Sequence, residues 1–246
     1  MLRNITVLCL FFFVCASCED KQSSTEKERV PIAETTKEED SVENEEEQKE
    51  EKEDRENQVK PEGPLLVQEE LIPFLMEYGK ENPEDEVRIK TRFGDIDLKL
   101  YHDTPLHRAN FIFLVKQDYF DNTFFHRVAE GFVIQGGNSD NPETNIKSHY
   151  IGDYLIPSEF EAGHKHVRGA LSAAKYSEQN VSKASSPYEF FIVQSERGAH
   201  HIDNEHTVFG RVTDGMEVVD SINKVEVDGS EWPLRNIHIL DAEILD

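Results

Sequence analysis

Hydrophobic and polar residues alternate along residues 87–100 and in several shorter segments farther along the chain. In the first segment Val87 and Ile89 alternate with basic residues, and the pattern resumes after a turn signal at Gly94. Alternation with a period of two is typical of strands that bury one face, so this segment is predicted to form a β-hairpin. Six further strands are predicted at residues 123–128, 132–135, 170–174, 189–193, 208–212 and 237–245.

Two helices are predicted among these strands. The first begins after Thr104, because threonine is a good N-cap and Pro105 can occupy the first helical position. The second follows Asp214, which is predicted to cap it, and runs to Ile222. Many short strands with two helices and no internal repeat predict a mainly β, barrel-type domain over residues 86–246.

Residues 65–85 form a further apolar segment in front of this domain. Pro73 lies within it and argues against one long uninterrupted helix. A short or kinked helix that lies on the domain is therefore predicted. The simplest interpretation is an N-terminal helical extension that covers an edge of the barrel.

Residues 19–64 differ in composition from the rest, with 18 acidic against 8 basic residues and no aromatic ones. Such a segment buries too little apolar surface to offset its chain entropy. An acidic disordered tether is predicted, with a solvated single helix as the alternative. The whole chain has a formal net charge of -24 at pH 7, so neither nucleic acid nor an anionic lipid surface is expected as a direct partner.

Residues 1–18 have the pattern of an export signal, in which Arg3 precedes an apolar run. The run is shorter than the roughly 20 apolar residues that span a bilayer. Ala16 and Ser17 then precede Cys18, which resembles a bacterial lipoprotein signal in which Cys18 becomes the lipid-bearing first residue. The resemblance implies a protein held by this lipid at a membrane of the bacterial cell envelope, facing the periplasm or the surface. A cleaved signal that releases a soluble protein is the alternative.

Thiol and metal chemistry are not expected in the mature domain. All three cysteines lie in the signal region, so no thiol remains for catalysis or metal binding. The histidines form no HExxH motif or regular ligand set, and no metal site is predicted. No G-x-S-x-G motif supports a Ser-His-Asp hydrolase.

The most informative segment is residues 124–137, FFHRVAEGFVIQGG. It sets Arg127 among apolar residues, where a permanent charge costs desolvation free energy unless it has a task. The segment resembles the FFHRV…GFxxQGG motif of the cyclophilin family of peptidyl-prolyl cis/trans isomerases. Later segments follow in the family's order, from about Val87 to the C-terminus: GALSAA at 169–174, FFI at 190–192 and HTVFGRV at 206–212.

The resemblance implies a closed eight-stranded antiparallel barrel capped by two helices. It also implies catalysis of rotation about X-Pro bonds in proline-containing polypeptides, here exported or unfolded proteins, by a monomer without a cofactor. The barrier to that rotation is about 18–20 kcal/mol, because the amide C–N bond has partial double-bond character. Lowering it requires no nucleophile, only tighter binding of the twisted amide than of either planar form.

The residues that match the family's site divide into a donor and a pocket. Arg127 matches the catalytic arginine, whose fixed charge suits a donor to the prolyl nitrogen. The resemblance assigns substrate binding to Phe132, Val133, Gln135, Ala174, Lys175, Phe191, His201, Ile202 and His206. A non-catalytic module that binds or scaffolds proline peptides is the alternative interpretation of the same pocket.

Three residues depart from the family pattern. Glu189 replaces a Gln and is predicted to modulate specificity, by pairing with Arg127 or Lys175 or by favouring substrates with a positive residue near the proline. Val133 replaces a larger Met, which predicts a slightly looser pocket. His201 stands where cyclosporin-sensitive members have Trp, so the resemblance does not extend to strong inhibition.

Overall fold

The computed structural model describes residues 59–176 and 181–245, all within the compact unit Gln48–Asp246. The predicted signal, Cys18 and the tether as far as residue 58 lie outside the described residues. Gly63, near the end of the predicted tether, donates its backbone N–H to the Gln117 side-chain oxygen at 2.7 Å. The chain therefore already rests on the domain at this point.

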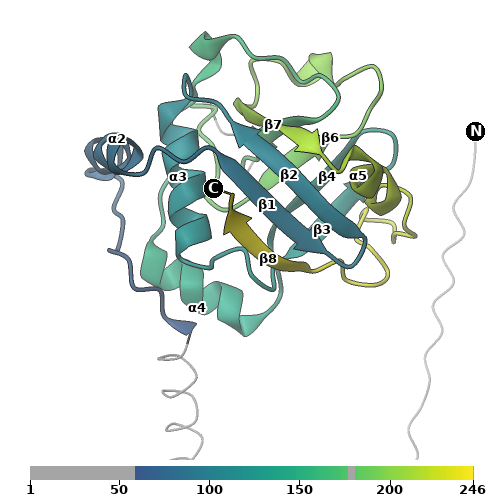
Figure 1. Cartoon of the computed structure of the whole chain (residues 1–246), viewed down its shortest axis with the longest axis horizontal. Coiled ribbons are helices and arrows are strands. Elements are labelled where there is room, and N and C mark those ends of the chain that lie inside the picture. Colours follow the sequence, from purple (N-terminus) through teal and green to yellow (C-terminus); the bar gives the residue numbers. More distant parts are fainter. Residues whose placement is uncertain (1–58, 177–180, 246) are drawn as a thin grey trace, which may run out of the picture. The chain divides into compact units, whose positions relative to one another are not determined.

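Eight antiparallel strands form one sheet in the order β3-β4-β6-β5-β7-β2-β1-β8 (Figure 1). The strands are β1 (Glu86–Thr91), β2 (Gly94–Leu100), β3 (Phe124–Ala129), β4 (Val133–Asn138), β5 (Ala170–Ala173), β6 (Phe190–Val193), β7 (Val208–Asp214) and β8 (Ile239–Ile244). All eight strands predicted from the hydrophobic pattern are present. Strict alternation marks β1, where Val87 and Ile89 are fully buried and their neighbours are not.

Contacts at the start of β8 bring β3 and β8, the two outer strands of the sheet, together. The Phe125 N–H donates to the Ile237 carbonyl, and the Ile239 N–H donates to the Thr123 carbonyl, both at 2.8 Å. Phe124 and His238 form an isolated antiparallel bridge between these bonds. The predicted eight-stranded antiparallel barrel is thus confirmed, in a nearly closed form.

Two helices flank the barrel on opposite sides, α3 (Pro105–Lys116) and α5 (Met216–Ile222) (Figure 1). Pro105 opens α3 as predicted, and Thr104 is its N-cap residue, but the Thr104 hydroxyl makes no capping bond. The Glu159 carboxylate accepts the Leu106 and His107 N–H groups instead, both at 3.0 Å. The prediction that Asp214 caps α5 is wrong, because Asp214 pairs with Asp97 as the last residue of β7. Gly215 occupies the N-cap instead, at a φ of 88° that favours glycine.

A helix that the hydrophobic pattern did not predict is α4 (Pro142–Ile151). The Asn141 side chain accepts a hydrogen bond from the Glu143 N–H at 3.1 Å, and Pro142 fills the first helical turn. Only Thr144 and Ile151 of this helix are buried, so it has almost no apolar stripe. The sequence signal for the start of this helix is the pair Asn141-Pro142. The hydrophobic periodicity gives no sign of it.

The N-terminal extension forms helix α2 (Leu71–Glu81). Pro73 lies in its first turn, where a missing N–H breaks no intrahelical bond, so the helix is uninterrupted. Phe74 and Tyr78 meet Phe113 of α3 edge-on, with ring centroids 5.5 and 5.3 Å apart. The extension therefore covers α3 rather than an edge of the barrel.

Buried apolar side chains form two separate clusters. The larger fills the barrel and its contacts with α2 and α3. The smaller joins Val133, Ala174, Phe191 and neighbours, with Phe132 and Ile202 packed against it. This second cluster gives the site described below a rigid apolar support.

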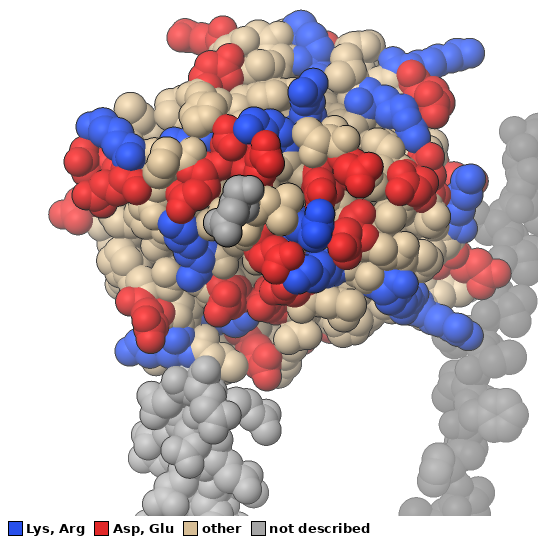
Figure 2. Space-filling view, viewed as in Figure 1, with Lys and Arg blue, Asp and Glu red and all other residues tan. Residues whose placement is uncertain are grey.

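The face over β1, β2 and β8 mixes both signs of charge (Figure 2). Arg88 pairs with Asp97 at 2.7 Å, and Lys90 pairs with Asp241 at 2.8 Å. Basic side chains on this face are thus largely matched by acids, and it presents no basic stripe. Among the helices within the described ranges, none is long and apolar enough to cross a membrane.

Candidate active site

Strand register places three of the predicted site residues in one row. Arg127 of β3 pairs with Gln135 of β4, and Gln135 pairs with Phe191 of β6. Directly opposed residues in an antiparallel sheet point to the same face. The fold therefore brings a guanidinium, an amide and an aromatic ring side by side, although the first and last are 64 positions apart in the sequence.

These side chains line a pocket of about 650 Å³. All ten residues named from the sequence as catalytic or substrate-binding lie around it, and Glu205 is an eleventh that sequence reasoning missed. The lining residues are Arg127, Phe132, Val133, Gln135, Ala174, Lys175, Phe191, His201, Ile202, Glu205 and His206. Glu189, the predicted modulator, does not line this pocket.

One wall of the pocket is apolar and firmly packed. Val133 and Phe191 are 2% and 4% exposed, so their positions are fixed by the cluster beneath them. Phe132 is half-buried, and the His201 ring lies 5.2 Å from its ring. Ile202 comes from the short 3-10 helix η2 (His200–Ile202). Such a wall suits a compact apolar ring.

Arg127 faces this wall from β3 and has an acidic partner. Its Nε donates to Glu231 Oε2 at 2.7 Å, and its Nη1 lies 3.5 Å from Gln135 Oε1, which is the limit of a hydrogen bond. The predicted pairing of Arg127 with Glu189 is wrong, because Glu231 occupies that role. The side chain of Arg127 is 38% exposed, so the guanidinium remains accessible from solvent.

Glu189 lies behind Gln135, directly before β6. Its carboxylate accepts hydrogen bonds from Gln135 and Asn138 at 2.9 Å, and His126 Nε2 lies 3.6 Å away. Burial would raise the pKa of Glu189, but the bonds from His126, Asn138 and Gln135 outweigh it and hold the pKa below its usual range. Glu189 therefore stays charged and fixes the orientation of the Gln135 amide.

Lys175 also finds a partner other than Glu189. Its Nζ lies 3.5 Å from Glu205 Oε2, while Lys183 contacts the other oxygen at 2.6 Å. The Lys175 side chain is only 8% exposed. The predicted pairing with Glu189 is thus wrong, and the two lysines instead share Glu205 at the pocket rim.

His206 closes the polar side of the pocket as a neutral ring. Its Nδ1–H donates to the Ala173 carbonyl at 3.0 Å, and its ring meets Phe191 edge-on at 5.2 Å. Burial lowers the pKa of His206 to about 4, despite that bond and with a further contribution from Lys175. Above about pH 5 the ring adds no charge to the pocket.

A buried histidine supports the pocket from below. His166 is fully buried, its Nδ1 lies 2.9 Å from Asp203, and its ring stacks on Phe191 at 5.8 Å. Its Nε2 lies 3.0 Å from Ser172 Oγ. The contacts join η2, β5 and β6 beneath the apolar wall. Within residues 59–176 and 181–245, no cluster of three or more His, Cys, Asp or Glu side chains could hold a metal ion.

Comparison with known sequences identifies the family. Residues 86–244 match the family model described as cyclophilin type peptidyl-prolyl cis-trans isomerase/CLD. The chain is 37% identical to peptidyl-prolyl cis-trans isomerase-like 3 of Dictyostelium discoideum, with 64% of this chain and 94% of that protein covered. The chain belongs to the cyclophilin family.

Other relatives agree with this assignment. Peptidyl-prolyl cis-trans isomerase CYP18-2 of Arabidopsis thaliana is 30% identical, with 68% of this chain and 97% of that protein covered. The chain spans only 30% of a longer isomerase-like 2 protein of Rhizopus delemar, to which it is 35% identical. A solved cyclophilin of Cryptosporidium parvum, 28% identical, has a TM-score of 0.56 and covers 66% of this chain and 98% of its own.

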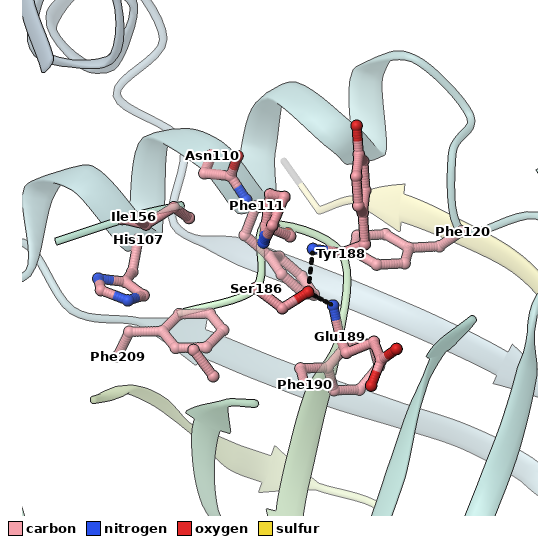
Figure 3. A pocket seen from close by; sticks show the side chains of 12 residues that line it. His107, Asn110, Phe111, Phe120, Ile156, Ser186, Tyr188, Glu189, Phe190 and Phe209 are labelled. Atoms are coloured by element: carbon pink, nitrogen blue, oxygen red, sulfur yellow. Dashed lines mark hydrogen bonds between the residues drawn. The ribbon is translucent and has the colours of Figure 1, made fainter. Parts of the chain in front are cut away.

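In the cyclophilin domain, a hydrogen-bonded turn at residues 186–189 leads into β6 beside a small cavity (Figure 3). Ser186 Oγ accepts hydrogen bonds from the Tyr188 and Glu189 N–H groups at 3.2 and 3.4 Å, which fixes the turn into β6. The cavity beneath, next to His107 and Asn110, is about 10 Å³, too small for a substrate side chain.

A second open pocket of about 390 Å³ lies on the other side of Glu189. Asp153 and Glu189 are among its lining residues, and within the described part of the chain no lysine or arginine lines it. Gly137 of β4 passes close to this edge, and a Cβ there would collide with the Tyr188 carbonyl oxygen. Glu189 links this pocket to the first one, because its carboxylate accepts a hydrogen bond from Gln135, which lines the first pocket.

Proposed function

We propose that this cyclophilin accelerates X-Pro rotation in exported polypeptides, with Arg127 as the catalytic residue. The observation that carries the proposal is the accessible guanidinium of Arg127, the one arginine among the described lining residues, set against a firmly packed apolar wall. The proline ring would rest on Phe132, Val133 and Phe191. The Gln135 amide would hold the substrate backbone, while Arg127 donates to the prolyl nitrogen as its lone pair localises in the twisted state.

The decisive experiment measures cis-to-trans isomerisation of a short X-Pro peptide by the full chain. We expect acceleration by the wild type and a loss of at least 100-fold in kcat/KM for Arg127→Ala, on the scale of removing one transition-state donor. Arg235→Ala is the matched control, because Arg235 is exposed and does not line the pocket. A folded wild type without activity would favour the alternative, a non-catalytic proline-peptide scaffold.

A second part of the proposal concerns substrate choice. Two acidic residues and, among the described residues, no lysine or arginine line the pocket beyond Glu189, which favours substrates with a lysine or arginine near the proline. Peptides that differ only in Lys or Glu at that position test this. The preference for Lys should shrink several-fold in Glu189→Gln, which removes the charge and keeps one acceptor oxygen for the Gln135 or Asn138 amide. An unchanged preference would reject the assignment.

The third part concerns location. The lipoprotein-like signal supports attachment of a monomeric enzyme to a membrane of the cell envelope through lipid on Cys18. Expression of the full chain with Cys18→Ser should release the protein from the membrane fraction. Continued membrane association of that variant would contradict the lipid anchor without affecting the isomerase proposal.

A further inference from the structure

We infer that Glu231 is a positioning residue that orients Arg127 for isomerisation. Glu231 Oε2 accepts a hydrogen bond from Arg127 Nε–H at 2.7 Å. None of the site residues named from the sequence makes so short a contact with Arg127. The bond engages the inner edge of the guanidinium fork. Among the described residues, the Nη1 and Nη2 groups have only the 3.5 Å contact to Gln135, so both remain for a substrate in the pocket.

The backbone that presents Glu231 is held in an unusual conformation. Its φ is 65°, in the left-handed region that non-glycine residues rarely adopt. The surrounding turn enforces it, because Glu231 N–H donates to the Asp228 carbonyl and Val128 N–H donates to the Glu231 carbonyl. The second bond ties the loop to the residue next to Arg127. Strain of this kind persists where the surrounding structure requires one geometry, often at functional sites.

The Arg127–Glu231 pair contributes little to stability. The two side chains are 38% and 44% exposed, and ion pairs in that setting add little to the free energy of unfolding. A left-handed glutamate is therefore a poor choice for stability alone, since glycine would suit the backbone better. The contact with Glu231 can instead limit the rotamers of Arg127.

The test rests on the proposed function and compares three full-length variants. Glu231→Gly removes the carboxylate and suits the backbone, so its thermal midpoint should equal or exceed that of the wild type. We expect its kcat to fall about 10-fold, with a much smaller change in KM. Glu231→Gln keeps an acceptor and should stay within about 3-fold of wild type. Glu226→Gln removes an exposed charge from the same loop, where the Glu226 carbonyl accepts a hydrogen bond from the Leu234 N–H, and should have no effect.

A double variant separates positioning from a merely structural role. If Glu231 acts through Arg127, adding Glu231→Gly to Arg127→Ala should cause no further loss. Full activity of Glu231→Gly, an increase in its activity, or additive losses in the double variant would each overturn the inference. An inactive wild type would instead reject the proposed function, so the two failures are distinguishable.

Discussion

Arg108 and Arg127 show how differently one fold uses the same side chain. Arg108 on α3 is 5% exposed and donates to the carbonyl oxygens of Gly79, Asn82 and Glu84 at 2.6 to 3.1 Å. Arg127 is half-exposed, with one carboxylate partner and a weak contact to Gln135. Arg108 uses its Nη1 and Nη2 donors within the chain, and its unpartnered Nε–H is buried where no substrate can reach it. Arg127 instead retains solvent-accessible donors that the described chain does not use, which is what a substrate requires.

The largest effect should come from breaking the structural arginine. Arg108→Met would leave the last carbonyls of α2 and the following turn without their donor, in a buried position. We expect the free energy of unfolding to fall by about 3 kcal/mol, as for the loss of a buried charged hydrogen-bond network. Urea denaturation measures it, with Arg92→Met as the exposed control.

Activity should respond differently to that substitution. The folded fraction of Arg108→Met should retain nearly wild-type kcat/KM, since Arg108 does not line the pocket. A large loss of catalysis without loss of stability would contradict the division between the two arginines.

The next effect concerns geometry at constant charge. Arg127→Lys keeps a positive charge but replaces the rigid fork by a single flexible ammonium group. We expect kcat/KM to fall about 30-fold, equivalent to about 2 kcal/mol, with an unchanged free energy of unfolding. Isomerisation of the X-Pro peptide and urea denaturation measure the two quantities. Activity close to wild type would mean that charge alone, without the fork, suffices.

The sequence allowed the barrel and the contents of the pocket to be predicted for particular reasons. Period-two alternation marks strands such as β1 directly, and the motif around Arg127 carries the family's site residues in order. The partners of those residues could not be predicted. Glu231 lies 104 positions from Arg127, on a loop whose left-handed turn has no apolar pattern. Charge alone predicts Arg127 or Lys175 as the partner of Glu189, but strand register gives it two neutral amide donors, with His126 3.6 Å away.

The smallest effect should distinguish the two regions by pH. The hydrogen-bond partners of Arg108 are carbonyl oxygens, which do not titrate. Burial would raise the pKa of its neighbour Glu84, but Lys116 and Arg108 outweigh it and hold that pKa below its usual range, so Glu84 titrates only in stronger acid. The pocket instead contains His206, with a pKa of about 4. An unfolded histidine has a pKa of about 6.5, so between pH 6.5 and 4 the unfolded chain binds a proton that the folded chain excludes. Stability from the neutral ring is therefore present above pH 6.5 and is lost as the pH falls toward 4.

His206→Gln isolates this contribution from that of the carboxylates. Both proteins should lose stability in acid, but the wild type should lose about 1 kcal/mol more between pH 7 and 4.5, a value reduced because part of the ring is exposed. Urea denaturation at the two pH values measures the difference. Equal losses would mean that His206 gains a proton without penalty, and that the polar side of the pocket is as tolerant of charge as the accessible edge of Arg127.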